Sequence, residues 1–169
     1  MSAAEPLVIL DTSVLINYAH VDRLDLLAGC FAEIRVVEQV QSELQRENQK
    51  LALDRALDSG IVTPCAVTDL SDIEEAFRLV FEDRRGRGES FSFVYARSQN
   101  GVLAIDDKRA VALFRRKHPE LITATSKELM VRAIQRGLIS IHEADAIKLI
   151  WENECRYKLL FGSFREQLG

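Results

Sequence analysis

The feature that most constrains this chain is a pair of short apolar runs that each end in acid. Leu7–Leu10 is followed directly by Asp11, and Val102–Ile105 is followed by Asp106 and Asp107. A short run without polar residues is typical of a strand buried on both faces, as in a parallel sheet. Because parallel strands end at one edge of their sheet, where α/β proteins place the functional crevice, we expect these acids to line a site.

The rest of the chain repeats this alternation of short strands and helices. Further β-branched or apolar runs occur at residues 34–37, 61–63 and 121–124, and segments of helical periodicity separate them. The alternation predicts an α/β protein, a three-layer sandwich whose central parallel sheet has four to five strands. A polar helix over residues 38–49 is expected after the second strand.

The chain length of 169 residues fits a single domain. We predict that residues 1–140 form this domain and that residues 141–169 are a C-terminal helical extension packed on it. The tail is expected to be helical and amphipathic from Ser140 to about Leu159. The marked interruption is a basic, glycine-rich surface loop at residues 83–88.

Composition excludes several functional classes. The chain has 26 acidic residues against 22 Lys and Arg, a net charge of −4, which argues against coating nucleic acid by bulk charge. The three cysteines, Cys30, Cys65 and Cys155, form no CxxC pair and support neither a disulfide framework nor a zinc site. No signal-like segment and no run of about 18 apolar residues is present, so we expect a cytoplasmic protein without a membrane span.

Two further acids are expected near the same sheet edge. Glu43 follows the second strand, and Glu89 opens the helix after the basic loop. Carboxylates that converge with Asp11 would repel one another unless a cation neutralised them, and Mg²⁺ or Mn²⁺ suits such hard oxygen ligands. Such an ion lowers the pKa of bound water and polarises a phosphoryl oxygen, which is the chemistry of phosphodiester hydrolysis.

Each acid taken alone also has an ordinary structural explanation. Asp11 can be a helix N-cap, Glu43 a solvated side chain on a polar helix, and Glu89 a helix-start acid favoured by the macrodipole. Of Asp106 and Asp107, one is expected to cap the next helix and the other to be a ligand.

Four motifs, in this order, resemble those of the PIN-domain family, metal-dependent nucleases that include the toxins of VapBC toxin–antitoxin systems. They are Val8–Ile16, Val40–Leu44, Gly88–Glu89 and Val102–Ala110. The stretch from Leu121 to Ile139 looks like the end of a prokaryotic PIN-like subgroup without an assigned activity. The resemblance covers about residues 7–140.

The resemblance implies an acidic catalytic quartet of Asp11, Glu43, Glu89 and Asp106. The implied metal ligands are Asp11, Glu89 and Asp106, with Asp107 as the alternative to Asp106. The third acid is Glu, where many members of the family have Asp. Ser13 matches the small polar residue that helps to hold the first acid and a metal-bound water.

The resemblance also implies a reaction and its partners. The chain would be a Mg²⁺- or Mn²⁺-dependent ribonuclease, the toxin of a type II toxin–antitoxin system, with RNA as substrate, a cognate antitoxin and a homodimeric state. The basic residues beside the acids would hold the RNA backbone. The expected substrate-binding residues are Ser13, Arg84, Arg85, Arg87, Lys108 and Arg109.

Two other classes compete with this interpretation. The first is a PIN-like protein without catalytic activity that binds RNA or a protein partner. The second is a phosphotransfer domain or a haloacid-dehalogenase-like hydrolase, which also places Asp after the first strand. The latter needs a second Asp two residues further on, where this chain has Ser13, and the former needs an acidic pair that is absent here.

Overall fold

The central sheet consists of five parallel strands in the order β3-β2-β1-β4-β5. The computed structural model describes residues 6–169, so the predicted domain start at residue 1 lies outside the described residues. The strands are β1 (Leu7–Leu10), β2 (Glu33–Val37), β3 (Thr63–Cys65), β4 (Val102–Ala104) and β5 (Thr123–Ala124). The predicted α/β sandwich with a parallel sheet is therefore confirmed.

β1 lies in the middle of the sheet, which explains why it is wholly apolar. Val8 is paired with Ile34 of β2 on one side and with Val102 of β4 on the other. Val8, Ile9 and Leu10 are fully buried. A strand covered on both faces loses the alternation of polar and apolar residues that a half-exposed strand shows.

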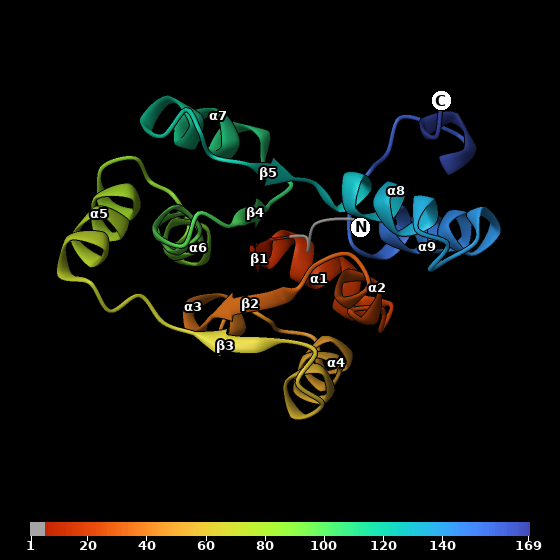
Figure 1. Ribbon diagram of the computed structural model, residues 1–169, viewed down its shortest axis with the longest axis horizontal. Helices are drawn as coiled ribbons and strands as arrows, with labels where there is room; N and C mark the ends of the chain where they lie inside the picture. Colours follow the sequence, from red (N-terminus) through yellow and green to blue (C-terminus); the bar gives the residue numbers. More distant parts are fainter. Residues whose placement is uncertain (1–5) are drawn as a thin grey trace.

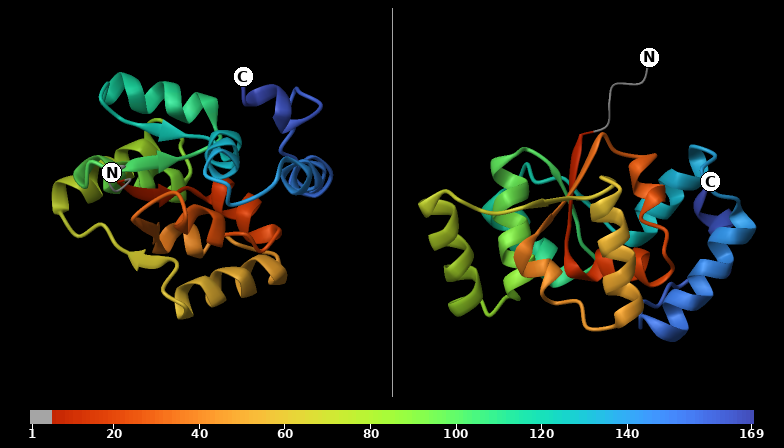
Figure 2. Two further views of the ribbon diagram at one scale, coloured as in Figure 1. Left: turned by 45° about the vertical axis from the view of Figure 1, so that its right-hand side comes forward. Right: turned by 90° about the horizontal axis from the view of Figure 1, so that it is seen from below.

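Helices cover both faces of the sheet (Figures 1 and 2). α5 and α6 lie on one side of the sheet, and α1, α2, α8 and α9 lie on the other. The stacked rings of Phe93 and Phe114, 4.3 Å apart, pack α7 against α6. The helices are α1 (Thr12–His20), α2 (Asp25–Ala28), α3 (Glu38–Gln41), α4 (Glu47–Asp58), α5 (Leu70–Phe81), α6 (Arg87–Ser98), α7 (Lys108–Lys117), α8 (Ser126–Gln135), α9 (Ile141–Glu154) and the 3₁₀ helix η1 (Phe164–Gln167).

The predicted helix over residues 38–49 is wrong, because the chain breaks between α3 and α4. The backbone turns tightly where the Glu43 N–H bonds to the Val40 carbonyl, and Arg46 is extended before α4 begins. The Glu43 side chain bonds to α1 and α6, and these long-range contacts replace those of a continuous helix. Tertiary contacts here override local helix propensity.

Two strands and the basic loop also differ from the prediction. The strand expected at residues 61–63 lies at 63–65 and contains Pro64, which is tolerated because β3 is an edge strand. β5 is only two residues long. The loop predicted at 83–88 is shorter, because α6 begins at Arg87 and so includes the last two of its residues.

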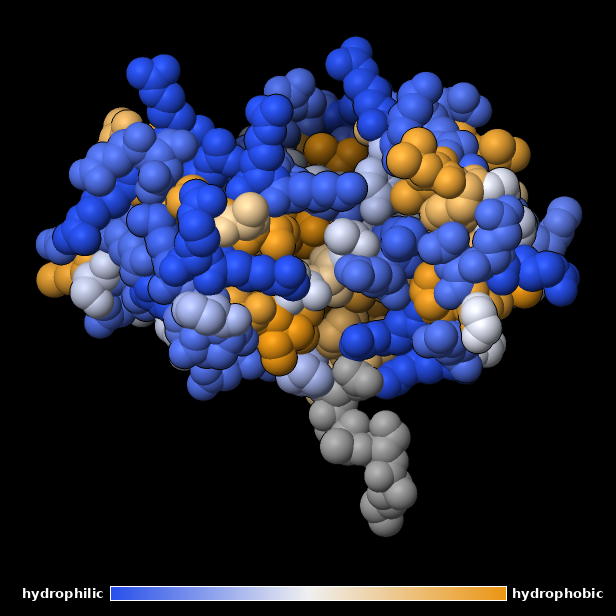
Figure 3. Space-filling model, turned by 90° about the horizontal axis from the view of Figure 1, so that it is seen from above, coloured by the Kyte–Doolittle hydropathy of each residue, from blue (hydrophilic) through white to orange (hydrophobic). Residues whose placement is uncertain are grey.

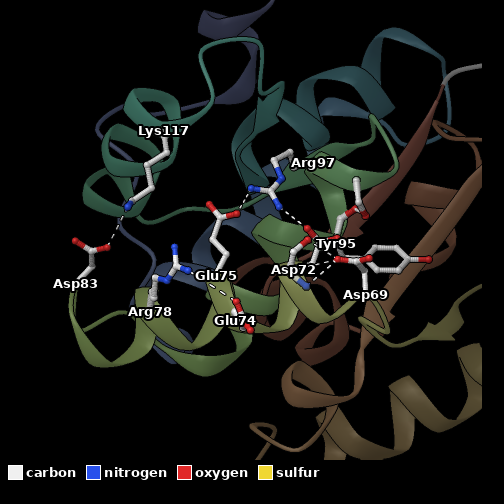
Figure 4. Close-up of polar contacts among 11 residues, drawn as sticks. Asp69, Asp72, Glu74, Glu75, Arg78, Asp83, Tyr95, Arg97 and Lys117 are labelled. Carbon is white, nitrogen blue, oxygen red and sulfur yellow. Dashed lines mark hydrogen bonds and ion pairs between the residues drawn. The ribbon is translucent and has the colours of Figure 1, made fainter.

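Ion pairs fix α5 and α7 around α6 (Figure 4). The Arg97 guanidinium of α6 bonds to Asp72 of α5, with Nη2 at 2.5 Å from Oδ1, and also to Glu75. Lys117 Nζ of α7 lies 3.4 Å from Asp83 Oδ2 in the loop before α6. The Arg97 pairs therefore join α6 to α5, and the Lys117 pair joins α7 to the loop that leads into Glu89.

The chain after residue 140 packs on the side of α1. Trp151 of α9 is fully buried, its Nε1 donates to the Asn17 carbonyl at 2.8 Å, and its ring contacts Tyr18 edge-on at 5.3 Å. The prediction of a helix as far as Leu159 is wrong, because α9 ends at Glu154. The domain boundary after residue 140 stays a prediction. No helix within residues 6–169 has both the length and the apolar character to cross a bilayer.

We expect Trp151→Ala to lower the free energy of unfolding by about 3–5 kcal/mol, because it removes a fully buried ring and its hydrogen bond. Urea unfolding followed by circular dichroism measures this change. Leu160→Ala is the control, since Leu160 is fully exposed, and we expect a change within about 0.5 kcal/mol. A small effect of Trp151→Ala would contradict the packing role of α9.

Candidate active site

The candidate site lies where β1 and β4 end side by side. The sheet order places these two strands together, and their following helices leave towards opposite faces, which makes this edge a topological switch point. The Asp11 N–H donates to the Ala104 carbonyl at 2.9 Å, so the two strand ends are in direct contact. Asp11, Asp106 and Asp107 therefore all emerge at this edge, as predicted from the two apolar runs.

Asp11 is buried and held by Ser13. Only 5% of Asp11 is exposed, and its Oδ2 accepts hydrogen bonds from Ser13 Oγ at 2.7 Å and Ser13 N at 3.2 Å, which caps α1. Ser13 Oγ also accepts from the Asp106 N–H at 3.2 Å and so joins the two strand ends. Burial raises the pKa of Asp11 to about 6, and the nearby charge of Glu89 acts in the same direction, against the Ser13 hydrogen bonds.

Glu43 joins three elements of the fold at the site. Its Oε1 accepts from the Gly88 N–H of α6 at 2.9 Å, and its Oε2 accepts a short hydrogen bond from the Thr12 hydroxyl of α1. A Cβ at position 88 would lie 2.5 Å from Glu43 Oε2, so only glycine admits the carboxylate here. The Gly88–Glu89 pair therefore supplies both a backbone donor and an acid.

Glu89 is the acid whose charge interacts with the others. Its Oε1 accepts from the Gly86 N–H at 2.8 Å and lies 3.8 Å from Arg85 Nε. Burial raises the pKa of Glu89, and the charges of Asp107 and Glu43 raise it further, whereas the Gly86 hydrogen bond and Arg85 lower it. Since Glu89 also raises the pKa of Asp11, it lies within electrostatic reach of three other carboxylates.

The two aspartates after β4 have different roles. Both carboxylate oxygens of Asp106 accept hydrogen bonds. Oδ1 accepts from Ser126 N at 2.7 Å, and Oδ2 accepts from Ser126 Oγ at 2.7 Å and from Asn17 Nδ2 at 3.0 Å. Burial raises the pKa of Asp106, against these hydrogen bonds and one from Tyr157. Asp107 is exposed and caps α7 through Oδ1 alone. Of the two aspartates, Asp107 is the one whose charge raises the pKa of Glu89, and its Oδ2 accepts no hydrogen bond within residues 6–169. Both observations favour Asp107 over Asp106 as the fourth site acid.

The basic residues before α6 divide into two groups. Arg85 is directed back to the protein, where its Nε donates to the Asp83 carbonyl at 3.3 Å and lies near Glu89. Arg84 is exposed, and Arg87 lines a shallow hollow together with Glu43. Of the three predicted contacts, Arg84 and Arg87 are therefore available to a ligand, while Arg85 acts on Glu89.

Lys108 and Arg109 lie in the first turn of α7, directly after Asp107. Both are exposed, and neither side chain forms an ion pair within residues 6–169. α7 lies at the top of Figure 1 and so faces the viewer in Figure 3, where hydrophilic side chains predominate and apolar ones form separate patches. The predicted bases thus lie at and just before the start of α6 and in the first turn of α7.

The donor set fits a hard divalent cation in its chemistry. It consists of carboxylate oxygens only, and the pKa values of Asp11 and Glu89 are raised by burial and by mutual repulsion, which a cation would relieve. As the side chains lie, no three His, Cys, Asp or Glu residues among positions 6–169 are grouped closely enough to hold a metal ion.

Comparison with known proteins identifies the class of protein that this fold and site define. A family model described as a PIN domain matches residues 7–158, which includes β1, every acid discussed above and most of the chain after residue 140. The chain belongs to the PIN-domain family, whose members are generally nucleases. A search of curated proteins finds no match.

Several residues of the site were not identified from the sequence. Thr12, Asn17, Ser126 and Tyr157 all bond to site carboxylates, and three of them come from α1 and α8. Thr12 could have been suspected, because it directly follows Asp11 in the first motif. Nothing in the local sequence marks Ser126 or Tyr157, which reach Asp106 only through the fold.

We expect Gly88→Ala to lower the free energy of unfolding by about 1–3 kcal/mol, because the new Cβ would displace the Glu43 carboxylate and leave its hydrogen bonds unmade. Gly86→Ala is a matched control two residues away, since the nearest atom to a Cβ there is Glu89 Cγ, at an ordinary 3.6 Å. Urea unfolding of both variants measures the difference. Equal stabilities would contradict the proposed clash.

We expect Asp11→Asn to stabilise the metal-free protein by about 1–3 kcal/mol at pH 7.5, because the folded chain penalises the ionised carboxyl. A folded pKa of about 6, above the ordinary 3.8, means that the wild type loses stability as the pH rises from about 4 to 6. The advantage of the variant should therefore vanish near pH 4. Asparagine retains the capping of α1.

Urea unfolding in EDTA at pH 7.5, 6 and 4 follows this difference. Asp69→Asn is the control, because Asp69 caps α5 in an exposed position where hydrogen bonds from Ser71 and Asp72 lower its pKa. That substitution should give no stabilisation at pH 7.5. A pH-independent effect of Asp11→Asn would show that charge burial is not its cause.

Proposed function

We propose that this protein is a metal-dependent ribonuclease that hydrolyses phosphodiester bonds of RNA at the edge where β1 and β4 end. The observation that carries the proposal is that Asp11, Asp106 and Asp107 meet where the ends of β1 and β4 are joined by hydrogen bonds, with the charge of Glu89 raising the pKa of Asp11. A protein keeps such mutually repelling acids together at a cost in stability, and perturbed carboxylates of this kind cluster at functional sites. Membership of the PIN-domain family, whose members are generally nucleases, supports the same function.

The chain's own residues would bind and orient the reacting groups. Four acids would hold Mg²⁺ or Mn²⁺, namely Asp11, Glu43, Glu89 and Asp107. Asp106 would not bind the ion, because its carboxylate accepts hydrogen bonds from Ser126. The ion, when bound, supplies a water of lowered pKa and stabilises charge on the phosphoryl oxygens. Ser13 keeps Asp11 oriented, and Thr12 and Gly88 keep Glu43 oriented. Such fixed positions reduce the reorganisation that catalysis requires.

Exposed bases on both sides of the acids support a nucleic-acid substrate. Arg84 and Arg87 approach from the α6 side, and Lys108 and Arg109 approach from α7. With four acids neutralised in part by the ion, these bases give the site a local field that the net charge of −4 does not reveal. RNA, a toxin role with a cognate antitoxin, a homodimeric state and a cytoplasmic location stay predictions that rest on the family resemblance.

A second candidate function is an RNA- or protein-binding module without cleavage. It is favoured by one observation: no three potential ligands are grouped closely enough for a metal ion among the described residues. Calorimetric titration with Mn²⁺ separates the two candidates. Binding that Glu43→Gln weakens supports the enzyme, and absence of binding supports the module.

We expect the wild type to cleave a labelled single-stranded RNA in Mn²⁺ and not to cleave it in EDTA. We expect Asp11→Asn to cleave this RNA at least about 100-fold more slowly in Mn²⁺. Asp107→Asn should show a loss of activity at nearly unchanged stability, because Asp107 is exposed and asparagine retains the capping of α7. Rates are measured by gel electrophoresis under single-turnover conditions.

Asp69→Asn again serves as the control and should cleave as the wild type does. Equal rates for the wild type and Asp11→Asn would refute the proposal, because they would show that any cleavage comes from a contaminant. Full activity of Asp107→Asn together with inactive, folded Asp106→Asn would reverse the assignment of the fourth acid.

A further inference from the structure

A second hollow lies next to Glu43, on the side away from Arg87. It has a volume of about 310 Å³ and joins α1, the start of α4 and the end of α9. Glu43 lines both this hollow and the one that Arg87 lines, so the site acid stands between them. Two arginines, Arg46 and Arg156, line the second hollow. They are separated by more than a hundred residues in sequence and come together only in the fold.

Arg156 has an unusual backbone conformation. It follows the end of α9 with φ 58°, the left-handed region in which glycine costs least and a residue with a Cβ costs about 1 kcal/mol more. The structure describes four non-glycine residues with positive φ, and two of these, Asp22 and Asn100, are of types that adopt it readily. The other two are arginines, Arg84 and Arg156, and they lie in the two regions that flank the site acids.

The segment around Arg156 is held firmly in place. The N–H groups of Cys155 and Tyr157 both donate to the Trp151 carbonyl at 3.1 Å. The Tyr157 ring contacts the Trp151 ring at 5.7 Å, and its hydroxyl accepts from the Lys127 N–H at 3.2 Å. The Arg156 side chain is exposed and forms no ion pair within residues 6–169. A charged group thus projects from a rigid backbone into the hollow beside Glu43.

Arg46 faces the same segment from the opposite wall. Arg46 lines the hollow together with Cys155, the residue before Arg156. Burial raises the pKa of the Cys155 thiol, and the nearby charge of Arg46 acts against this rise. Arg46 is exposed and has no capping hydrogen bond from its side chain at the start of α4. The remaining acid of this hollow, Glu154, accepts a 2.7 Å hydrogen bond from His20 Nε2, so its carboxylate already has a partner. The two arginines are therefore available to an anion.

We propose that Arg46 and Arg156 form a second phosphate-binding subsite that holds the RNA strand on the far side of the acids from Arg84 and Arg87. The proposal rests on the proposed ribonuclease function and makes the end of α9 part of the substrate groove. A strand that crosses Glu43 would place one phosphate against the α6 arginines and another in this hollow. Contacts on both sides of the scissile bond orient it for attack.

The test compares Arg156→Gly with the wild type in binding a fluorescein-labelled, unstructured 12-nucleotide RNA in EDTA, where no cleavage occurs. We expect about three- to tenfold weaker binding, and a slope of log K against log salt that is smaller by about 0.7, the value for one lost phosphate contact to a single strand. Because φ 58° favours glycine, the variant should unfold at an equal or higher urea concentration. A loss of affinity then cannot come from misfolding.

Arg46→Ala is the second variant and should show the same decrease in affinity and slope. Arg165→Ala is the matched control: it removes an exposed arginine from η1 that does not line the hollow, and should bind RNA as the wild type does. If the wild type binds and cleaves RNA but both site variants keep its affinity and salt slope, the subsite is refuted and the ribonuclease proposal stands. If the wild type neither binds nor cleaves RNA, both proposals fail together.

Discussion

The structure depends on the burial of negative charge at the end of its central strand. β1 must be apolar because both of its faces are covered, and Asp11, the next residue, therefore leaves the sheet almost without contact with solvent. Burial raises the pKa of its carboxyl to about 6, and Glu89 adds repulsion. Hydrogen bonds from Ser13 offset part of this cost, and the same hydroxyl ties β1 to β4. Stability and site chemistry are set by one group of contacts.

The other acids follow the same pattern, since each is held by donors from a different element. Glu43 is bound by Thr12 and by the backbone of Gly88, and Asp106 is bound by Ser126 and Asn17. These hydrogen bonds hold the carboxylates in place. Glu43 lies in the irregular segment between α3 and α4, where the backbone is not helical. Such pre-arranged polar groups cost stability in the ligand-free protein, and a cation or substrate would relieve their repulsion.

Much of the fold could be predicted from the sequence, and so could the location of the site. β1 and the acid after it could be predicted without tertiary information, because a short run of four apolar residues is typical of a strand buried on both faces. Helix bounds that depend on local caps could also be predicted, such as the start of α9 after its N-cap Ser140. Predictions were wrong where a long-range contact determines the backbone conformation. The predicted helix over residues 38–49 is interrupted where Glu43 bonds to Gly88 of α6. β3 contains Pro64, which a strand tolerates only at the edge of a sheet.

The sequence by itself determined that the chain is a parallel α/β protein with acids at the carboxyl ends of β1 and β4, because hydrophobic period and strand-end position are local properties. Only the tertiary structure decided how those acids are used. In the fold, Asp106 accepts a hydrogen bond from Ser126, whereas Asp107 lies within electrostatic reach of Glu89. This difference between the two aspartates depends on hydrogen-bond donors from α1 and α8. It also brought Arg156 to the hollow beside Glu43, because α9 ends against α1 and α4, and no local pattern records that contact.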